Sequence, residues 1–214
     1  MKTIRIVCLT GIVVALTMCS PVREQKKSLS ELNRRARAIK IYAEKNGYAN
    51  RYCFLLDMRL QSGLKRFFVY DFKRDVVAFS GLVAHGSCDQ SFLKTARFSN
   101  TGGGGCTSIG IYKVGNAYYG QYGKAYKLHG LENSNSNAYR RSIVLHGYQC
   151  IPDQECYPKP ICNSSGCPMV SPAFLKKLSS IIDQSGKPVL LWIYYTPAPQ
   201  LTSILRRSAK TKPV

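Results

Sequence analysis

Three short apolar and aromatic segments in the first half of the chain constrain its fold most strongly. They cover residues 52–57 (YCFLLD), 66–72 (RFFVYDF) and 76–84 (VVAFSGLVA), and are rich in β-branched and aromatic side chains. Turn-forming residues separate them, at 61–63 (QSG) and 73–75 (KRD). We therefore expect the core to begin as an antiparallel β-meander.

A helix is predicted before these strands, over residues 28–45. Ser28 is placed to cap its amino terminus, with Glu31 at the capping-box position, and residues 46–47 (NG) are a typical helix end. Its apolar residues recur at helical spacing, so it is expected to pack on the outside of the domain. These residues are Leu32, Ala36, Ile39 and Ala43.

A second helix is predicted over residues 172–184. Ser171 is a typical N-cap and Pro172 a typical first helical residue, while Gly186 marks the end. The uninterrupted apolar segment 189–195 (VLLWIYY) that follows is typical of a central strand buried on both faces. The fold class expected is therefore mostly β, of α+β type: a mixed sheet or sandwich flanked by the two helices.

Between these elements, residues 99–138 are rich in Gly, Ser and Asn. A low-complexity linker is one interpretation. However, residues 109–112 (IGIY) and 117–128 (AYYGQYGKAYKL) have the pattern of short strands joined by tight turns. A loop-rich functional rim is the interpretation we favour.

The amino terminus has the pattern of an export signal. Lys2 and Arg5 precede an apolar run over residues 6–18, which is short for a bilayer-spanning helix but suits a signal peptide. A buried amino-terminal strand or helix is the alternative. Residues 16–19 (LTMC) loosely resemble a bacterial lipobox, which would make Cys19 a lipidation site, although Met18 stands where a small residue is usual. An ordinary signal peptide or an uncleaved anchor would explain the same residues.

The chain is strongly basic, with a formal net charge of +20. The basic residues are scattered, and no zinc-finger spacing or RNA-binding aromatic motif accompanies them. We therefore expect no nucleic-acid partner and favour attraction to anionic envelope polymers or lipid head groups. A lipid at Cys19 would add a membrane partner. The Pro-rich, basic segment 196–214 is predicted to be a flexible tail.

Nine cysteines agree with an oxidising compartment. Cys8 and Cys19 lie in or at the end of the predicted signal, and setting Cys167 aside leaves six, enough for three disulfides of unassigned pairing. Three of the six share one loop and are placed to staple it. A zinc site is the rival, but no Cys-x-x-Cys pair and no His at ligand spacing supports it. The loop cysteines are Cys150, Cys156 and Cys162.

Cys167 and His146 have the residue types of a thiol acyl-transfer site. A free thiol with a pKa of about 8.5 is only about 3% ionised at neutral pH, so a cysteine nucleophile needs a base. His146 ends the short apolar segment 142–145, and Gly147 would turn the chain and offer a carbonyl to the imidazole. Gly166 would let the backbone approach a substrate carbonyl, with amides around Gly166 and Cys167 as an oxyanion hole. Spacing alone leaves a disulfide role for Cys167 open.

Several blocks in a fixed order resemble a known enzyme family. Together they are similar to the L,D-transpeptidase catalytic domain of YkuD-type fold, in its branch that carries Ser-Trp-Gly-Cys-Pro. The resemblance covers roughly residues 50–195. The blocks are LVAHG (82–86), FSN (98–100), SIGIY (108–112), YYGQYGKAYKLHGLE (118–132), NSNAYRRSIVLHG (135–147) and SSGCP (164–168).

The resemblance implies an exported cell-wall enzyme that acts on peptidoglycan stem peptides. Its cysteine attacks the carbonyl of the third stem residue, a diamino acid, and expels the terminal D-amino acid. Cys167 takes the nucleophile position, His146 the general base, and Gly147 the carbonyl that orients the base. Because thiol acyl transfer uses protein groups alone, no metal, nucleotide or redox cofactor is implied.

Four residues are predicted to contact substrate: Ser164, Ser165, Arg141 and Tyr119. Ser164 fits the family's signature, and Arg141 matches an Arg shortly before the His strand. Arg141 would hold a substrate carboxylate or pair with Glu132, and the two are equally favoured. Tyr119, like its neighbours, would line a peptide groove or pack around the glycine turns.

Three residues of the signature loop depart from the family, which puts substrate preference in doubt. Ser165 stands where this branch has Trp, Asn163 replaces an Arg, and Pro168 fits the branch but not the wider family. Of the remaining histidines, His85 is expected to be structural rather than a second site residue, and His129 exposed or structural.

The expected organisation is a signal peptide at 1–19, a helical segment at 20–49, a catalytic domain at 50–195 and the tail at 196–214. Two other functions stay open. A carboxypeptidase or cross-link hydrolase would use the same Cys with water as acceptor. A non-catalytic, disulfide-rich envelope-binding protein would instead have Cys167 blocked, for example by Cys162.

Overall fold

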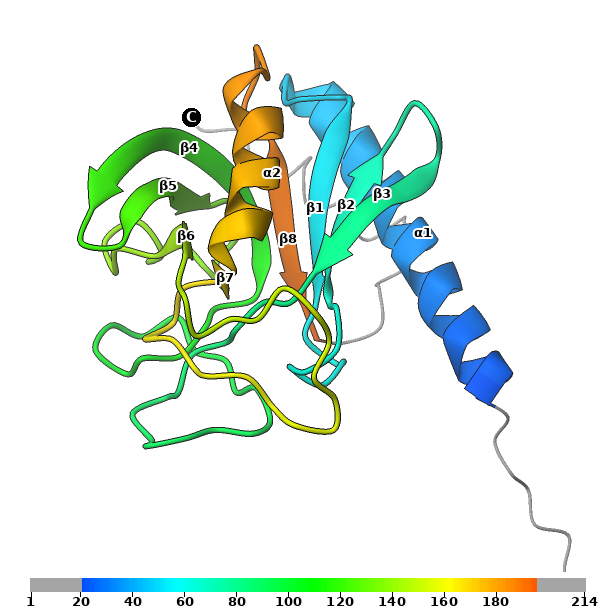
Figure 1. Ribbon diagram of the computed structural model, residues 1–214. Helices are drawn as coiled ribbons and strands as arrows, with labels where there is room; N and C mark the ends of the chain where they lie inside the picture. Colours follow the sequence, from blue (N-terminus) through cyan, green and yellow to red (C-terminus); the bar gives the residue numbers. More distant parts are fainter. Residues whose placement is uncertain (1–20, 196–214) are drawn as a thin grey trace, which may run out of the picture.

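The strands and helices follow the predicted order along the chain (Figure 1). The computed structural model describes residues 21–195, so the predicted signal peptide, the lipidation site at Cys19 and the tail at 196–214 lie outside the described residues. The elements are α1 (Pro21–Asn46), β1 (Tyr52–Asp57), β2 (Phe67–Asp71), β3 (Val76–Gly81), β4 (Gly110–Gly120), β5 (Gly123–Gly130), β6 (Val144–Gly147), β7 (Met169–Val170), α2 (Pro172–Asp183) and β8 (Leu190–Tyr194).

All eight strands belong to one mixed sheet, in the order β3-β2-β1-β8-β4-β5-β6-β7. Strands β1 to β3 form the predicted antiparallel meander. The last strand, β8, inserts between β1 and β4, parallel to the first and antiparallel to the second. Strands β6 and β7 form a second parallel pair at the sheet's edge. The mostly β, α+β fold class is thus confirmed, with one helix near the start and one after the Cys167 loop.

The two helices cover opposite faces of the sheet, and strand alternation explains how. In β1, Cys53 and Leu55 pack in the cluster with α1, whereas Phe54 and Leu56 pack in the cluster with α2. Because β8 faces both helices in the same way, each of its residues is buried, which accounts for its uninterrupted apolar sequence.

Helix α1 begins earlier than the sequence predicted. It starts at Pro21, so Ser28 lies inside the helix and the predicted N-cap is wrong. Glu31 instead binds Arg34 and Arg35. The predicted end is close to the observed one, since the helix stops at Asn46 and Gly47 has a φ of 73°.

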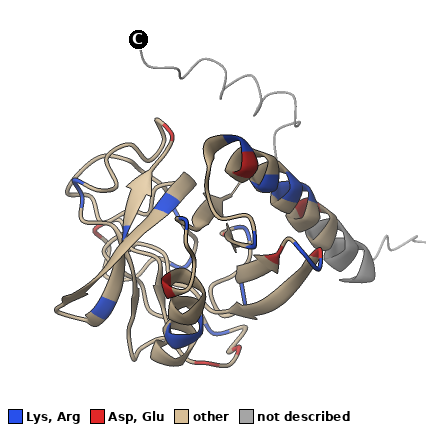
Figure 2. Ribbon diagram, turned by 90° about the horizontal axis from the view of Figure 1, so that it is seen from above, with Lys and Arg blue, Asp and Glu red and all other residues tan. Residues whose placement is uncertain are grey.

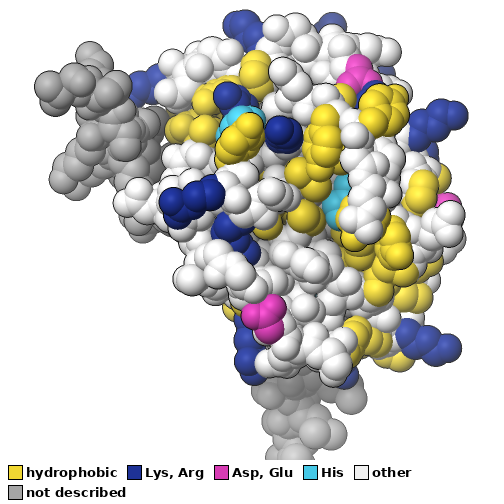
Figure 3. Space-filling model, turned by 90° about the vertical axis from the view of Figure 1, so that its left-hand side faces the viewer, with side chains coloured by type: hydrophobic (Ala, Val, Ile, Leu, Met, Phe, Trp, Pro, Cys, Tyr) yellow, Lys and Arg dark blue, Asp and Glu magenta, His cyan; other side chains and the backbone are white. Residues whose placement is uncertain are grey.

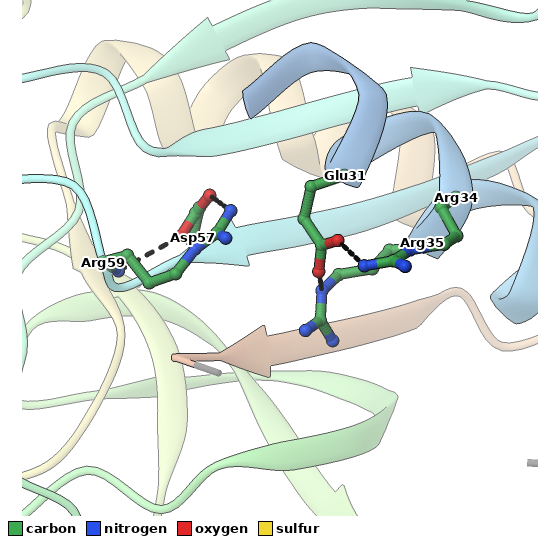
Figure 4. Close-up of polar contacts among 5 residues, drawn as sticks. All are labelled: Glu31, Arg34, Arg35, Asp57 and Arg59. Carbon is green, nitrogen blue, oxygen red and sulfur yellow. Dashed lines mark hydrogen bonds and ion pairs between the residues drawn. The ribbon is translucent and has the colours of Figure 1, made fainter. Parts of the chain in front are cut away.

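A buried arginine fixes α1 on the sheet. Arg35 is 2% exposed, its Nε donates to Glu31 at 2.9 Å, and its guanidinium lies 3.9 Å from the ring centroid of Tyr194 and 4.7 Å from that of Trp192. Burial lowers the pKa of Arg35, and the Glu31 carboxylate opposes that shift. Beside this group, Arg59 donates to Asp57 at the end of β1 (Figure 4).

Basic residues are spread over the described chain. Figure 2 shows Lys and Arg on α1, on α2 and on several strands, with few acidic residues between them. In residues 21–195 we find no helix with the length and apolar character that crossing a bilayer requires.

Replacing Arg35 with alanine tests its role. Arg35→Ala leaves the buried Glu31 carboxylate without one of its partners and removes the packing on Trp192, so we expect about 3–5 kcal/mol lower unfolding free energy. Urea unfolding followed by Trp192 fluorescence measures it. Arg37→Ala, at an exposed position of the same helix, should change the free energy by less than about 0.5 kcal/mol. Equal effects from both would contradict this account.

Candidate active site

The pairing of β6 with β7 brings Cys167 and His146 to one place. His146 pairs with Met169 in parallel register, so Cys167, two residues earlier, lies beside Val144. The Val144 amide donates to Cys167 Sγ at 3.4 Å. Cys167 and His146 both line a surface cavity of about 470 Å³, which we call the thiol cavity. Figure 3 shows a face of the molecule on which hydrophobic side chains gather around a histidine.

The turn that carries Cys167 is shaped by Ser164 and Gly166. Gly166 has a φ of 112°, and a Cβ there would lie 2.8 Å from the Cys106 carbonyl oxygen, so only glycine fits. Ser164 Oγ accepts from the Gly166 amide at 3.2 Å and donates to the Cys167 carbonyl at 2.6 Å. Thr107 Oγ1 donates to the Gly166 carbonyl at 3.1 Å. The hydroxyl of Ser164 is therefore engaged within the turn.

These contacts leave one of the two expected oxyanion donors available. The Gly166 amide donates to Ser164, whereas the Cys167 amide donates to no acceptor among residues 21–195. A free amide on the nucleophile itself is a suitable donor to an oxyanion.

The His146 ring is held from two sides. Its Nδ1 lies 3.2 Å from the Gly147 carbonyl oxygen, which can only accept, so Nδ1 carries the proton and Nε2 is left as an acceptor. The Tyr122 ring stacks on it at 4.8 Å between centroids. Burial lowers the pKa of His146, with the Gly147 carbonyl opposing, so the ring is neutral at pH 7.

The Cys167 thiol is protonated in the resting site. Burial raises the pKa of Cys167, and the Val144 amide and the Arg141 charge oppose the rise without reversing it. A neutral thiol and a neutral imidazole that line the same cavity match base-assisted attack, in which the proton moves as the sulfur reacts.

The four predicted substrate residues lie in different settings. Ser165 is exposed and Ser164 is buried, and both line the thiol cavity. Arg141 donates to the carbonyls of Ser99 and Cys106. The predicted alternative of an Arg141–Glu132 ion pair is therefore wrong.

Tyr119 is 81% exposed in β4 and does not line the thiol cavity, whereas Tyr122 does. Sequence analysis grouped the two tyrosines and named only Tyr119 as a substrate contact, which stays a prediction. The sequence signal that could have singled out Tyr122 is the glycine that follows it. Gly123 has a φ of 74° and ends a tight turn between β4 and β5, and Tyr122 lies in that turn.

The other histidines have structural partners. His85 is fully buried, its Nδ1 accepts from Arg66 at 2.8 Å and its Nε2 donates to the Leu93 carbonyl at 3.0 Å. Burial lowers the pKa of His85 to about 4, and the Arg66 charge adds to that effect. His129 stacks on Tyr139. Within residues 21–195, no three His, Cys, Asp or Glu side chains are grouped so that they could hold a metal ion.

Asn163 holds the loop around Leu93 in place. Its Oδ1 accepts from the Leu93 amide at 2.6 Å and its Nδ2 donates to the Leu93 carbonyl at 3.1 Å. These contacts tie the loop around Leu93 to the Cys167 turn, beside the thiol cavity that Asn163 also lines.

Two disulfides form rather than the three expected from six cysteines. Cys88 pairs with Cys106, and Cys150 pairs with Cys162, which staples the loop as predicted. Cys53 is free because strand alternation points it into the core under α1, away from the loops. Cys156 and Cys167 are also free. Since Cys162 is already paired, the Cys162–Cys167 alternative is wrong.

Comparison with known proteins shows the family of this chain. The family model for the L,D-transpeptidase catalytic domain matches residues 23–194. No curated protein matches the chain.

Solved structures similar to the chain include three that we report. The helical cell shape determining protein Pgp2 (K307A mutant) of Campylobacter jejuni shares 14% identity over 73% of this chain and 53% of its own, with a TM-score of 0.46. Bd1075 of Bdellovibrio bacteriovorus shares 16% identity over 77% of this chain and 55% of its own, with a TM-score of 0.45. An L,D-transpeptidase (residues 123–326) of Xylanimonas cellulosilytica shares 14% identity over 72% of this chain and 68% of its own, with a TM-score of 0.38. The chain spans about half the length of the first two.

The pH dependence of Cys167 alkylation tests the resting state of the site. Because burial raises the pKa of this thiol, the iodoacetamide rate should climb with pH and reach half its maximum above about pH 8.5, the usual thiol value. Peptide mass spectrometry assigns the label to Cys167. A neutral His146 adds no positive charge, so His146→Ala should leave that midpoint nearly unchanged. A plateau by about pH 7 that is lost in His146→Ala would instead indicate a preformed thiolate–imidazolium pair.

Proposed function

Because the chain belongs to the L,D-transpeptidase catalytic-domain family, we propose that it is an exported, cysteine-dependent L,D-transpeptidase of peptidoglycan stem peptides. One observation carries the proposal: an unpaired thiol and an oriented, neutral imidazole line the same open cavity. A thiol blocked in a disulfide would have favoured a purely structural protein.

In the first half-reaction, Cys167 Sγ attacks the carbonyl of the diamino acid at the third stem position, and the thiol proton passes to His146 Nε2. The Gly147 carbonyl accepts from Nδ1–H and stabilises the imidazolium that forms. The Cys167 amide donates to the developing oxyanion. When the C–N bond breaks, His146 returns the proton to the amine of the departing D-amino acid, leaving a thioester on Cys167.

In the second half-reaction, an acceptor resolves the thioester. His146 takes a proton from an attacking amine, the C–S bond breaks, and the thiol regains its proton, which yields a cross-link or an exchanged amino acid. Water in the same position yields a shortened stem, which is the carboxypeptidase alternative. The thiol cavity lies at the surface and is lined by the exposed Ser165, so both acceptors would have access.

The two disulfides support export, because such bonds persist in oxidising compartments. The formal net charge of +20 would favour the approach of the protein to anionic envelope polymers. Anchoring through Cys19 remains a prediction from the sequence.

Substitution at the two proposed catalytic residues tests the function. Purified protein is incubated with tetrapeptide-stem muropeptides and the products are followed by mass spectrometry. We expect dimers or exchanged D-amino acids from wild type, no turnover from Cys167→Ala, and a loss of about 10²–10⁴-fold from His146→Gln. Cys156→Ser removes the other partly exposed free thiol of residues 21–195 and should keep activity. Folded but inert wild type, or turnover by Cys167→Ala, would refute the proposal.

Lipidation is tested separately by the intact mass of protein isolated from a bacterial host with lipoprotein processing. If Cys19 is modified, the mass exceeds that of the processed chain by its acyl groups, and Cys19→Ser removes the excess. An unmodified wild-type mass would show an ordinary signal peptide instead.

A further inference from the structure

A cavity of about 570 Å³ lies where strand β4 departs from regular pairing with β5. The register shifts between Val114 and Ala117, and the two residues in between line the cavity together with the end of α2. None of its lining residues lines the thiol cavity. Ala125 of β5 pairs with His146, and His129 in the wall of this cavity lies four residues further along β5, about 13 Å away at the usual rise per residue. The cavity is therefore separate from the candidate active site.

Basic side chains gather at one wall of this cavity, which we call the basic cavity. Lys113 of β4 lies directly opposite His129 of β5, and both line it. Lys127 lies two residues before His129, on the same face of the strand. Burial, and then the charges of Lys113 and Lys127, lower the pKa of His129. On the side of the molecule that β4 and β5 form, Figure 3 shows basic and hydrophobic side chains beside a histidine.

No acidic partner balances these charges in the part of the chain that the structure describes. Neither Lys113 nor Lys127 makes an ion pair there. The carboxylate in the cavity wall, Asp183, is already bound, by Lys124 Nζ at 2.6 Å and by the Tyr126 hydroxyl at 2.8 Å. A bound anion would supply the counter-charge that the two lysines lack.

Aromatic rings border the same basic group. Tyr139 is 54% exposed and stacks on His129 at 4.8 Å between ring centroids. Lys127 Nζ lies 5.3 Å from the centroid of the Tyr139 ring and 5.6 Å from that of Tyr118. Gly115 makes room for the imidazole, because a Cβ there would lie 2.7 Å from His129 Nε2. An exposed ring is thus held next to two ammonium groups.

We propose that the basic cavity binds an acidic sugar unit of an anionic polysaccharide. The carboxylate or phosphate of the sugar would accept hydrogen bonds from Lys113 and Lys127, and the apolar face of the sugar ring would pack on Tyr139. The volume suits such a ligand, since small-molecule sites measure about 300–1,000 Å³. An envelope polymer held here would leave the thiol cavity open and would keep the protein near the cell wall.

Nuclear magnetic resonance of the histidine ring protons tests the proposal on purified protein, and His129→Gln assigns the signal. The probes are glucuronate, for a carboxylated polymer, and glucose 6-phosphate, for a phosphorylated one. We expect at least one of them to shift the His129 signal saturably and to raise the pKa of His129, because the anion offsets the charges of Lys113 and Lys127. Neutral glucose should not do so. The double variant Lys113→Ala/Lys127→Ala should weaken binding by about tenfold or more.

Two further variants separate sugar recognition from general attraction to a basic protein. Lys73→Ala is the matched control, because it removes an exposed lysine between β2 and β3, and it should bind the probe as wild type does. Tyr139→Ala should weaken binding of the sugar but not of its simple counterpart, acetate for glucuronate or inorganic phosphate for glucose 6-phosphate. Circular dichroism checks that each variant is folded.

The proposal is refuted if neither acidic sugar shifts the His129 signal saturably, if glucose or the simple anion binds as tightly as the acidic sugar, or if the double lysine variant binds like wild type. Binding to phosphatidylglycerol vesicles that the double variant loses, without binding of either sugar, would identify a lipid surface as the ligand and refute it too. Each of these results leaves the proposed function standing, because turnover of muropeptides at Cys167 is measured independently of this cavity.

Discussion

The parallel pairing of β6 with β7 is the constraint on which the site depends. Strand β7 has only two residues, yet it is tied on both sides, to β6 through His146–Met169 and to the segment after β3 through Ala84–Met169. Because Cys167 lies two residues before Met169, this register sets the thiol beside Val144. The position of the Cys167 thiol relative to β6 is thus fixed by main-chain hydrogen bonds rather than by a loop alone.

Helix α2 reinforces that register from the other side. Ser171 directly follows β7 and caps the helix by accepting from the Phe174 amide at 3.1 Å. Phe174 and Leu178 then pack in the same cluster as Leu145 of β6, so the helix that leaves the Cys167 turn is anchored against the strand that carries His146. The chain on both sides of the nucleophile is therefore held by the core.

Much of this arrangement follows from local sequence signals. The meander, the doubly buried β8 and the start of α2 were predicted, because strand alternation, apolar runs and a Ser-Pro cap each act over a few residues. The predictions that failed concern residues whose partners are distant in the sequence or the fold. The pattern Ser28–Glu31 predicted a cap, but Glu31 faces the buried Arg35 over Trp192, which no local pattern reveals. Cys53 was predicted to take part in a disulfide, but its position in β1 places its side chain in the core.

The candidate site shows the same division. The sequence named Cys167, His146 and Gly147, because the family resemblance carries these positions. It could not rank Tyr119 against Tyr122, since the two-residue β4–β5 turn decides which ring reaches the imidazole. Nor could it show that Asp89 and Arg140 line one cavity, because a disulfide and the Asn100–Asn137 contacts bring their separate loops there.

The central claim is that Cys167 carries the acyl group between donor and acceptor. Its most direct test is the mass of the protein itself, quenched in acid shortly after mixing with a tetrapeptide-stem donor and no amine acceptor. The account predicts an adduct equal to the donor minus its terminal D-amino acid, located by peptide mapping on the fragment that contains Cys167. Product release without such an adduct, or an adduct on another residue, would contradict it.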